Sequence, residues 1–81
     1  MKFQIKKRFS NEILIEGEAN SFKEFVEANK TDLSEANLSE TDLSETNLSK
    51  TDLYKANLYK AKIKITQKDE IIKALKIEII T

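Results

Sequence analysis

The chain has 81 residues, a length that predicts one small domain with a thin stability margin. Its 14 Lys and Arg residues balance 14 Asp and Glu residues, and this zero net charge argues against a simple nucleic-acid binder, a polyanion mimic or a membrane-surface protein. The lack of cysteine and histidine excludes disulfides, thiolate metal sites and a histidine base. Short apolar runs and the lack of a signal peptide predict a soluble cytoplasmic protein that does not enter a membrane.

The segment 1–19 is typical of a β-hairpin. Phe3, Ile5 and Phe9 alternate with polar residues, which indicates a strand with one apolar face. Ser10 and Asn11 are turn formers, and residues 13–15 supply a second apolar run. We therefore expect two antiparallel strands joined near Asn11.

A short helix is predicted to follow the hairpin. Ser21 and Glu24 have the spacing of a capping box, in which each side chain bonds a free backbone N–H of the first helical turn. Phe22, Phe25 and Val26 then share one face. This apolar face predicts that the helix covers a neighbouring core.

Residues 31–65 repeat with a period of five, in units such as TDLSE and ANLYK. In a straight α-helix, a step of one unit turns the side chain by about 140°, so the leucines would point to every face. In a straight strand, the same step moves each leucine to the opposite face. The period therefore requires a corner in every unit, so that all the leucines point at one axis, and this predicts a solenoid.

The repeat resembles the pentapeptide-repeat family, whose unit is A-[DN]-L-x-x. The resemblance implies a mainly β fold, a right-handed quadrilateral β-helix with four units per coil, here about 1.75 coils. The repeat of this chain departs from the family unit in two ways: Thr replaces Ala at several small positions, and the last unit lacks Asp or Asn. The inward positions are the large Leu33, Leu38, Leu43, Leu48, Leu53, Leu58 and Ile63, and the small Thr31, Ala36, Thr41, Thr46, Thr51, Ala56 and Ala61.

The charge pattern offers an internal test of the coil length. A coil of four units would stack opposite charges as cross-strand neighbours, namely Glu35 over Lys55, Glu40 over Lys60 and Asp42 over Lys62. A coil of three units also gives opposite-charge pairs, such as Glu35 with Lys50, so the pattern leaves three units per coil open. The choice of four units depends mainly on the resemblance.

A second cap is predicted after the repeats. Thr66 and Asp69 form a capping signature, Ile71, Ile72 and Leu75 line one helix face, and residues 76–80 are typical of a short strand. The repeats alone bury too few side chains to offset the entropy of ordering them, so both caps are needed. We expect one domain over residues 1–81, with a cap at 1–30, repeats at 31–65 and a cap at 66–81.

Sites of chemistry have weak support. The serines recur with the repeat and have no histidine partner, so we expect no enzyme and no cofactor. Carboxylates that could bind a hard cation would lie on opposite walls of a square coil, and bonds to the local backbone explain them more simply; these are Asp32, Glu35, Asp42 and Glu45.

A cluster late in the repeats is the sharpest surface feature and consists of Lys50, Lys55, Lys60, Lys62 and Lys64 with Tyr54 and Tyr59. We call Tyr54, Tyr59, Lys50, Lys55 and Lys60 the lysine–tyrosine patch. Such residues can stack bases and pair with phosphates. The alternative is that the lysines face acidic residues one coil away and the tyrosines pack under the C-terminal helix.

We expect a non-enzymatic structural or protein-interaction module with a rigid surface and an unidentified protein partner. The alternatives are a nucleic-acid-associated protein that uses the lysine–tyrosine patch and, with less support, a DNA mimic that binds topoisomerases, as some family members do. The expected rod of about 8 Å matches only two or three base pairs. The segment 77–80, with Ile77 and Ile79, could pair with the hairpin or with a second copy; similarity to family members that dimerise through C-terminal elements favours a homodimer.

Overall fold

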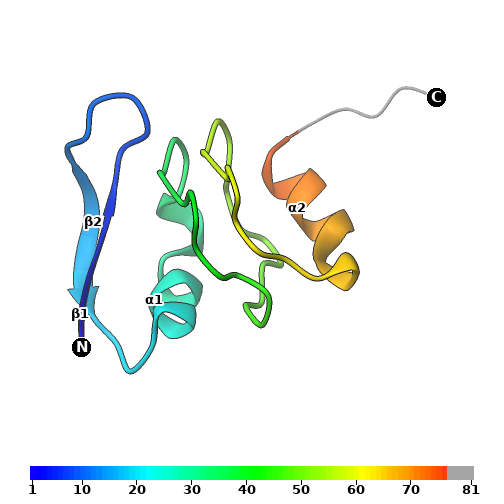
Figure 1. Cartoon of the computed structure of the whole chain (residues 1–81), viewed down its shortest axis with the longest axis horizontal. Coiled ribbons are helices and arrows are strands. Elements are labelled where there is room, and N and C mark those ends of the chain that lie inside the picture. The colour runs from blue at the N-terminus through cyan, green and yellow to red at the C-terminus, as the bar shows by residue number, and fades with distance from the viewer. Residues whose placement is uncertain (77–81) are drawn as a thin grey trace.

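The computed structural model describes residues 1–76, which form a row of layers 42 Å long, 27 Å wide and 21 Å deep. Figure 1 shows the order of the layers: a hairpin at one end, helix α1 and the repeats in the middle, and helix α2 at the other end. None of the helices in this part of the chain is long and apolar enough to cross a membrane.

The N-terminal layer is a two-stranded antiparallel sheet of β1 (Lys2–Lys6) and β2 (Ile13–Glu18). Ile5 lies opposite Ile15, and the pairing is irregular just after Ile5. The predicted hairpin is present, with Asn11 in the left-handed conformation at its turn. Phe9 was expected on the apolar strand face, but the strand ends before it and its side chain is 67% exposed.

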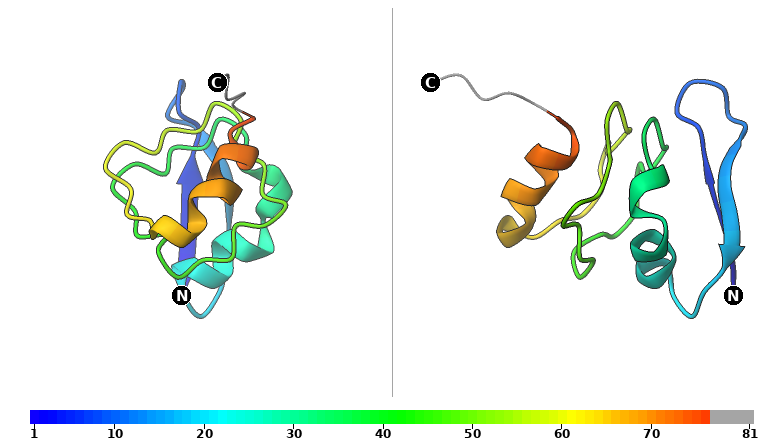
Figure 2. Two further views of the ribbon diagram at one scale, coloured as in Figure 1. Left: turned by 90° about the vertical axis from the view of Figure 1, so that its right-hand side faces the viewer. Right: turned by 180° about the vertical axis from the view of Figure 1, so that it is seen from behind.

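Helix α1 (Phe22–Ala28) begins where the capping box predicted it. Ser21 Oγ accepts a hydrogen bond from the Glu24 N–H at 3.2 Å, and the Glu24 carboxylate accepts one from the Asn20 N–H at 3.3 Å. Phe25 is buried, and its ring stacks on that of Phe3 with centroids 5.6 Å apart. The helix is thereby packed between the hairpin and the repeats (Figure 2).

The repeats return beside themselves after every four units. Parallel bridges pair Asn37 with Asn57 and Asp42 with Lys62. Backbone bonds flank the first of these bridges, since the Leu38 N–H donates to the Asn57 carbonyl and the Asn57 N–H to the Ala36 carbonyl, both at 2.9 Å. This pairing corresponds to four units per coil and not to three. Within the described residues, the repeat backbone thus pairs with itself at an offset of 20 residues.

Each corner is a turn closed by a bond from the small residue of one unit to the leucine carbonyl of the unit before. One example is the Ala56 N–H, which donates to the Leu53 carbonyl at 2.9 Å. The residue before the small one has a positive φ between 58° and 61° at Glu35, Glu40, Lys50, Lys55 and Lys60. Glu45 differs, because its turn is closed by the Thr46 N–H without a positive φ. A residue in the left-handed conformation lets the chain turn sharply at the corner, and this turn points the leucines of successive units inward.

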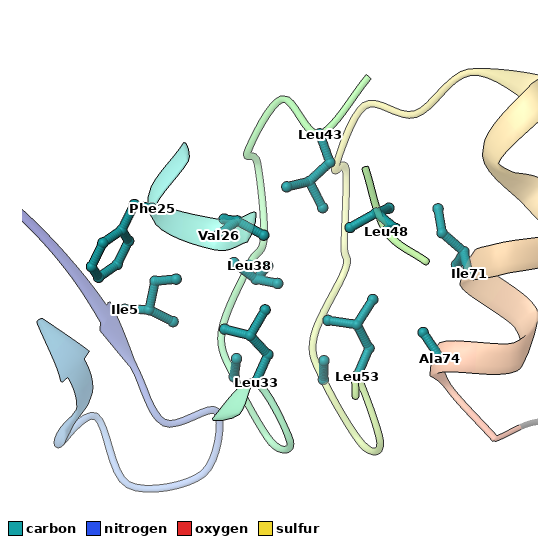
Figure 3. Close-up of a cluster of buried hydrophobic side chains, with 12 residues drawn as sticks. Ile5, Phe25, Val26, Leu33, Leu38, Leu43, Leu48, Leu53, Ile71 and Ala74 are labelled. Atoms are coloured by element: carbon teal, nitrogen blue, oxygen red, sulfur yellow. The ribbon is translucent and has the colours of Figure 1, made fainter. Parts of the chain in front are cut away.

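The interior of the coil is a stack of leucines. Figure 3 shows these side chains between Ile5, Phe25 and Val26 on one side and Ile71 and Ala74 on the other. Each leucine of the stack is at most 3% exposed; the stack consists of Leu33, Leu38, Leu43, Leu48 and Leu53. Among the small residues Ala36, Thr46, Thr51 and Ala56 are buried, and Thr41 and Ala61 are half-buried.

Two residues assigned to the core lie on the surface. Thr31 is exposed because residues Lys30–Asp32 form a 3-10 turn that leads from α1 into the coil. Ile63 is 44% exposed because it lies in the last repeat unit, beyond which the described chain has no further coil. Leu58, in the unit before, is half-buried and packs against the core.

The C-terminal layer is α2 (Lys68–Ala74), preceded by a 3-10 turn at Ile65–Gln67. Figure 2 shows α2 crossing the end of the coil. The predicted cap by Thr66 and Asp69 is wrong, because the helix begins after Gln67 without a side-chain cap bond. Ile71 is buried against the coil. The predicted strand at 76–80 falls outside the described residues except for Lys76.

Glu27 of α1 and Gln67, the residue directly before α2, bond the backbone of the coil with their side chains. The Glu27 carboxylate of α1 accepts from the Asn47 N–H at 2.7 Å, one coil later in the chain. The Gln67 amide donates to the carbonyls of Leu43 and Thr46 at 2.6 and 2.9 Å. These bonds satisfy backbone groups that a further coil would otherwise pair. The segments at the two ends of the repeats therefore supply hydrogen bonds that a neighbouring coil would otherwise make.

Candidate interaction surface

The tyrosines of the lysine–tyrosine patch are presented by two successive corners of the second coil. Tyr54 follows Asp52, whose Oδ1 accepts the Tyr54 N–H at 3.0 Å. Tyr59 follows Asn57 in the same way, with Oδ1 accepting its N–H at 3.0 Å. The side chains are 43% and 66% exposed, so neither is packed under α2 as one interpretation expected. The local bonds fix the backbone at each tyrosine while the ring remains in solvent.

Each tyrosine ring has an ammonium group over its face. Lys55 Nζ lies 5.4 Å from the centroid of Tyr54, and Lys60 Nζ lies 5.4 Å from that of Tyr59. Lys76 Nζ is a second cation over Tyr54, at 5.5 Å, and is 3.9 Å from the Asp52 carboxylate. These contacts are attractive cation–π pairs. They combine an aromatic surface and a positive charge at each corner.

The patch is less extended than the sequence indicated. Lys50 instead lines a shallow cavity of about 380 Å³ with Glu70 and Lys73 of α2. The Arg8 guanidinium, from the hairpin loop, donates to the Lys55 carbonyl at 3.2 Å. Arg8 thus adds a cation to the Tyr54 corner that the repeat pattern did not indicate. Ile77 and Ile79, which were assigned to the interaction surface, lie outside the described residues.

The expected stacked ion pairs do not form among residues 1–76. Glu35, Glu40 and Asp42 are not within ion-pair distance of the lysines one coil later, and the pairs that do form include Lys64 with Glu45. Lysine side chains are long and flexible, so Lys55 and Lys60 reach the neighbouring tyrosine ring instead.

In three of the four units of the first coil, an Asp or Asn side chain bonds the serine two residues later. Asp42 Oδ1 accepts from both the N–H and the hydroxyl of Ser44, at 3.0 and 2.6 Å. The Ser44 hydroxyl and N–H lower the pKa of the Asp42 carboxyl, with smaller contributions from the charges of Lys62 and Lys64. Ser39 and Ser49 are held in the same way by the preceding asparagines. Each of these hydroxyls donates to the side-chain oxygen of the residue two positions before it.

The carboxylates considered for a cation site do not converge. Within residues 1–76 there is no group of three or more acidic side chains with the spacing of metal ligands. Asp42 is bonded to Ser44, and Glu45 is paired with Lys64. Two of the four carboxylates are therefore engaged, Asp42 by donors of its own unit and Glu45 by a lysine one coil later.

The chain's relation to known proteins follows from the repeats. Residues 31–64 match the family model described as pentapeptide repeats, in eight copies. The chain is a pentapeptide-repeat protein. Membership of this family indicates a β-helical structural or interaction module. Comparison with curated proteins and with solved structures finds no match.

Several structural residues of this pentapeptide-repeat protein had no signal in the repeat pattern. Lys30 Nζ donates to the Ser49 carbonyl at 3.0 Å, and Gln67 joins α2 to the coil. Glu27 accepts from Asn47, and this N–H, with Lys23, lowers the pKa of the Glu27 carboxyl. All three lie outside the repeats, so the family's pattern assigns them no role.

Proposed function

We propose that this pentapeptide-repeat protein is a non-enzymatic interaction module, built on a right-handed quadrilateral β-helix of less than two coils. Its binding surface consists of the corners at Tyr54–Lys55 and Tyr59–Lys60, and its partner is a protein with an acidic surface. The observation that carries the proposal is the pair of exposed tyrosine rings at successive fixed corners, each with a lysine over its face.

The chemistry of these corners suits a protein partner. Tyrosine supplies a large contact area with few rotatable bonds, which is why it is enriched in binding hot spots. A lysine beside it favours a carboxylate and speeds association through long-range attraction. The backbone bonds at Asp52 and Asn57 hold both corners in place before binding, which lowers the entropy lost on association.

Site-specific photo-crosslinking in the native cell tests this proposal. A photoreactive phenylalanine analogue replaces Tyr59, and the matched control carries it at Ser39, the same unit position one coil earlier. We expect a discrete protein adduct from position 59 that is absent from position 39 and is lost when Lys55 and Lys60 are changed to glutamate. Equal adducts from both positions would contradict the assignment of the surface.

A nucleic-acid partner is the second candidate, because Lys55 and Lys60 form no ion pair in the described chain. Stacking of a base on Tyr54 requires a free ring face, and Lys55 and Lys76 already lie over that ring. Titration with single-stranded oligonucleotides at two salt concentrations separates the candidates. Steeply salt-dependent binding that is lost in the tyrosine variants would favour nucleic acid.

A further inference from the structure

Helix α2 crosses the end of the coil obliquely (Figure 2). Gln67, just before the helix, bonds the Thr46 carbonyl at 2.9 Å, and the Ala74 carbonyl at its end accepts from the Leu53 N–H at 2.8 Å. The corner at Lys50 falls between these two points of attachment along the chain, and a cavity of about 380 Å³ opens between this corner and the helix. The cavity is lined by Ser49, Lys50, Thr51, Glu70, Lys73 and Ala74.

The backbone N–H of Lys50 is a hydrogen-bond donor at this cavity. At the same unit position in the first coil, the Glu35 and Glu40 N–H groups donate toward the C-terminal end, to the Tyr54 and Tyr59 carbonyls at 2.7 and 2.8 Å. Lys50 has the same left-handed backbone, with a φ of 58° against 61° and 60°. Its N–H therefore points in the same direction, toward α2, and it makes no hydrogen bond to any of residues 1–76.

Two lysine ammonium groups and one carboxylate line the same cavity. Lys50 and Lys73 are exposed, Glu70 is half-buried, and none of the three forms an ion pair within the part of the chain that the structure describes. Lys30 adds positive charge behind the corner, where its Nζ lies 3.0 Å from the Ser49 carbonyl. Ammonium and amide donors in this combination favour a ligand with negatively charged oxygens.

A second donor in the cavity wall lacks an acceptor. Thr51 is 6% exposed, and its Oγ1 is buried without a hydrogen bond to any described residue. The hydroxyl of Thr41, at the same unit position, donates to the Leu38 carbonyl instead. A buried hydroxyl without a partner is costly, and an oxyanion in this cavity supplies the missing acceptor.

We propose that this corner cavity binds inorganic phosphate. The Lys50 N–H, the ammonium groups of Lys50 and Lys73 and the Thr51 hydroxyl donate to its charged oxygens. Glu70 selects among oxyanions, because its carboxylate repels an ion that has only acceptor oxygens and accepts a hydrogen bond from one that keeps an O–H. Near neutral pH inorganic phosphate keeps an O–H, whereas sulfate has none and a phosphate monoester, with a second pKa of about 6, is mostly without one.

Nuclear magnetic resonance titration of the full chain tests the site, with sodium phosphate, sodium sulfate and sodium chloride as probes at matched ionic strength. We expect phosphate to shift the Lys50 amide proton downfield in a saturable way, with an affinity about tenfold higher than that of sulfate. The Lys60 amide, at the same unit position with the same φ of 58°, is the internal control and should not move. Equal affinities for phosphate and sulfate, or equal shifts at Lys50 and Lys60, would overturn the proposal, because they would show charge screening alone.

Two positions of α2 separate the roles of its side chains. Lys73→Met should weaken phosphate binding about tenfold, whereas Lys68→Met, which removes an exposed lysine of the same helix outside the cavity, should leave it unchanged. Glu70→Gln should raise the affinity for sulfate and bring it close to that for phosphate. Equal losses in both lysine variants, or an undiminished preference for phosphate in Glu70→Gln, would show that these side chains do not form the site.

Glycerol phosphate, a monoester, distinguishes the two sources of a phosphate group. It should bind about as weakly as sulfate, and tighter binding than that of inorganic phosphate would overturn the assignment to the free ion. The corners at Tyr54 and Tyr59 are unchanged in every variant and no partner protein is used, so failure here is distinct from failure of the proposed function.

Discussion

Replacing Thr51 by valine tests how the coil interior responds to a hydroxyl without a partner. Thr51 is 6% exposed, and its Oγ1 is buried with no hydrogen bond to any described residue. An unsatisfied buried hydroxyl costs about 1–3 kcal/mol, and valine has the same shape without the polar atom. We expect Thr51→Val to raise the free energy of unfolding by about 1–2 kcal/mol, a large part of the total of about 4–12 kcal/mol for a chain of this size.

Thr41 provides the matched control, because it occupies the same position of another unit with its hydroxyl paired. Thr41 Oγ1 donates to the Leu38 carbonyl at 2.6 Å. Thr41→Val removes this bond and should lower the free energy of unfolding by about 0.5–1.5 kcal/mol. The same chemical change is thus expected to have opposite signs at the two positions.

Urea unfolding followed by circular dichroism measures both variants, with an unchanged slope indicating that only stability has changed. A gain of about 1 kcal/mol at Thr51 corresponds to a rise in melting temperature of about 4–8 °C. A loss at Thr51 as large as that at Thr41 would refute the reasoning, because it would mean that the Thr51 hydroxyl is satisfied in solution.

Three further predictions concern polar contacts. Gln67→Ala should lower the free energy of unfolding by about 1–3 kcal/mol in urea titrations, because it leaves the Thr46 carbonyl unpaired and removes one of the two bonds to the Leu43 carbonyl; a loss below about 0.5 kcal/mol would contradict this. The pKa of Glu27 is lowered by the Asn47 N–H, so its contribution to stability is complete above about pH 4.5 and is lost as the pH falls through the folded-state pKa. Melting temperatures measured from pH 6 to 3 should therefore fall less steeply for Glu27→Gln, and parallel curves would argue against this linkage. A double-mutant cycle on Glu40 and Lys60 should give a coupling near zero, since no ion pair joins them, and a coupling above about 1 kcal/mol would show that one forms in solution.

The period of the repeat predicted the interior of the coil because it reflects a constraint on every unit. A leucine at each third position can reach one axis only if the chain turns at each corner, and Leu33 to Leu53 lie there. The pattern failed at its two ends, Thr31 and Ile63, where the chain enters from α1 and leaves for α2. A residue at an inward position of a unit is therefore buried only where another coil or a helix covers that unit on both sides.

The contacts of the caps could not be predicted in the same way. Glu27 and Gln67 bond backbone groups a full coil or more away along the chain, and the sequence around a polar side chain does not encode which distant N–H or carbonyl it meets. Asp42 and Lys62 are cross-strand neighbours as expected, but the stacked charges form no ion pair in the described chain, for a related reason. Exposed opposite charges attract by only about 1 kcal/mol, which is too little to fix a lysine that can also lie over a tyrosine ring.

The attachment of both helices to particular walls limits how such a protein can grow. Glu27 bonds one side of the coil at Asn47, and Gln67 bonds the carbonyls of Leu43 and Thr46 from the other side. Insertion of one five-residue unit after Glu45 would move every later unit to the next wall of the coil. Helix α2 would then no longer meet the groups that it contacts now. Insertion of four units would restore the same wall, because the chain returns to the same wall after every four units. Viable relatives of different length should therefore differ by whole coils, and a lengthened variant with any other increment would need a new C-terminal helix.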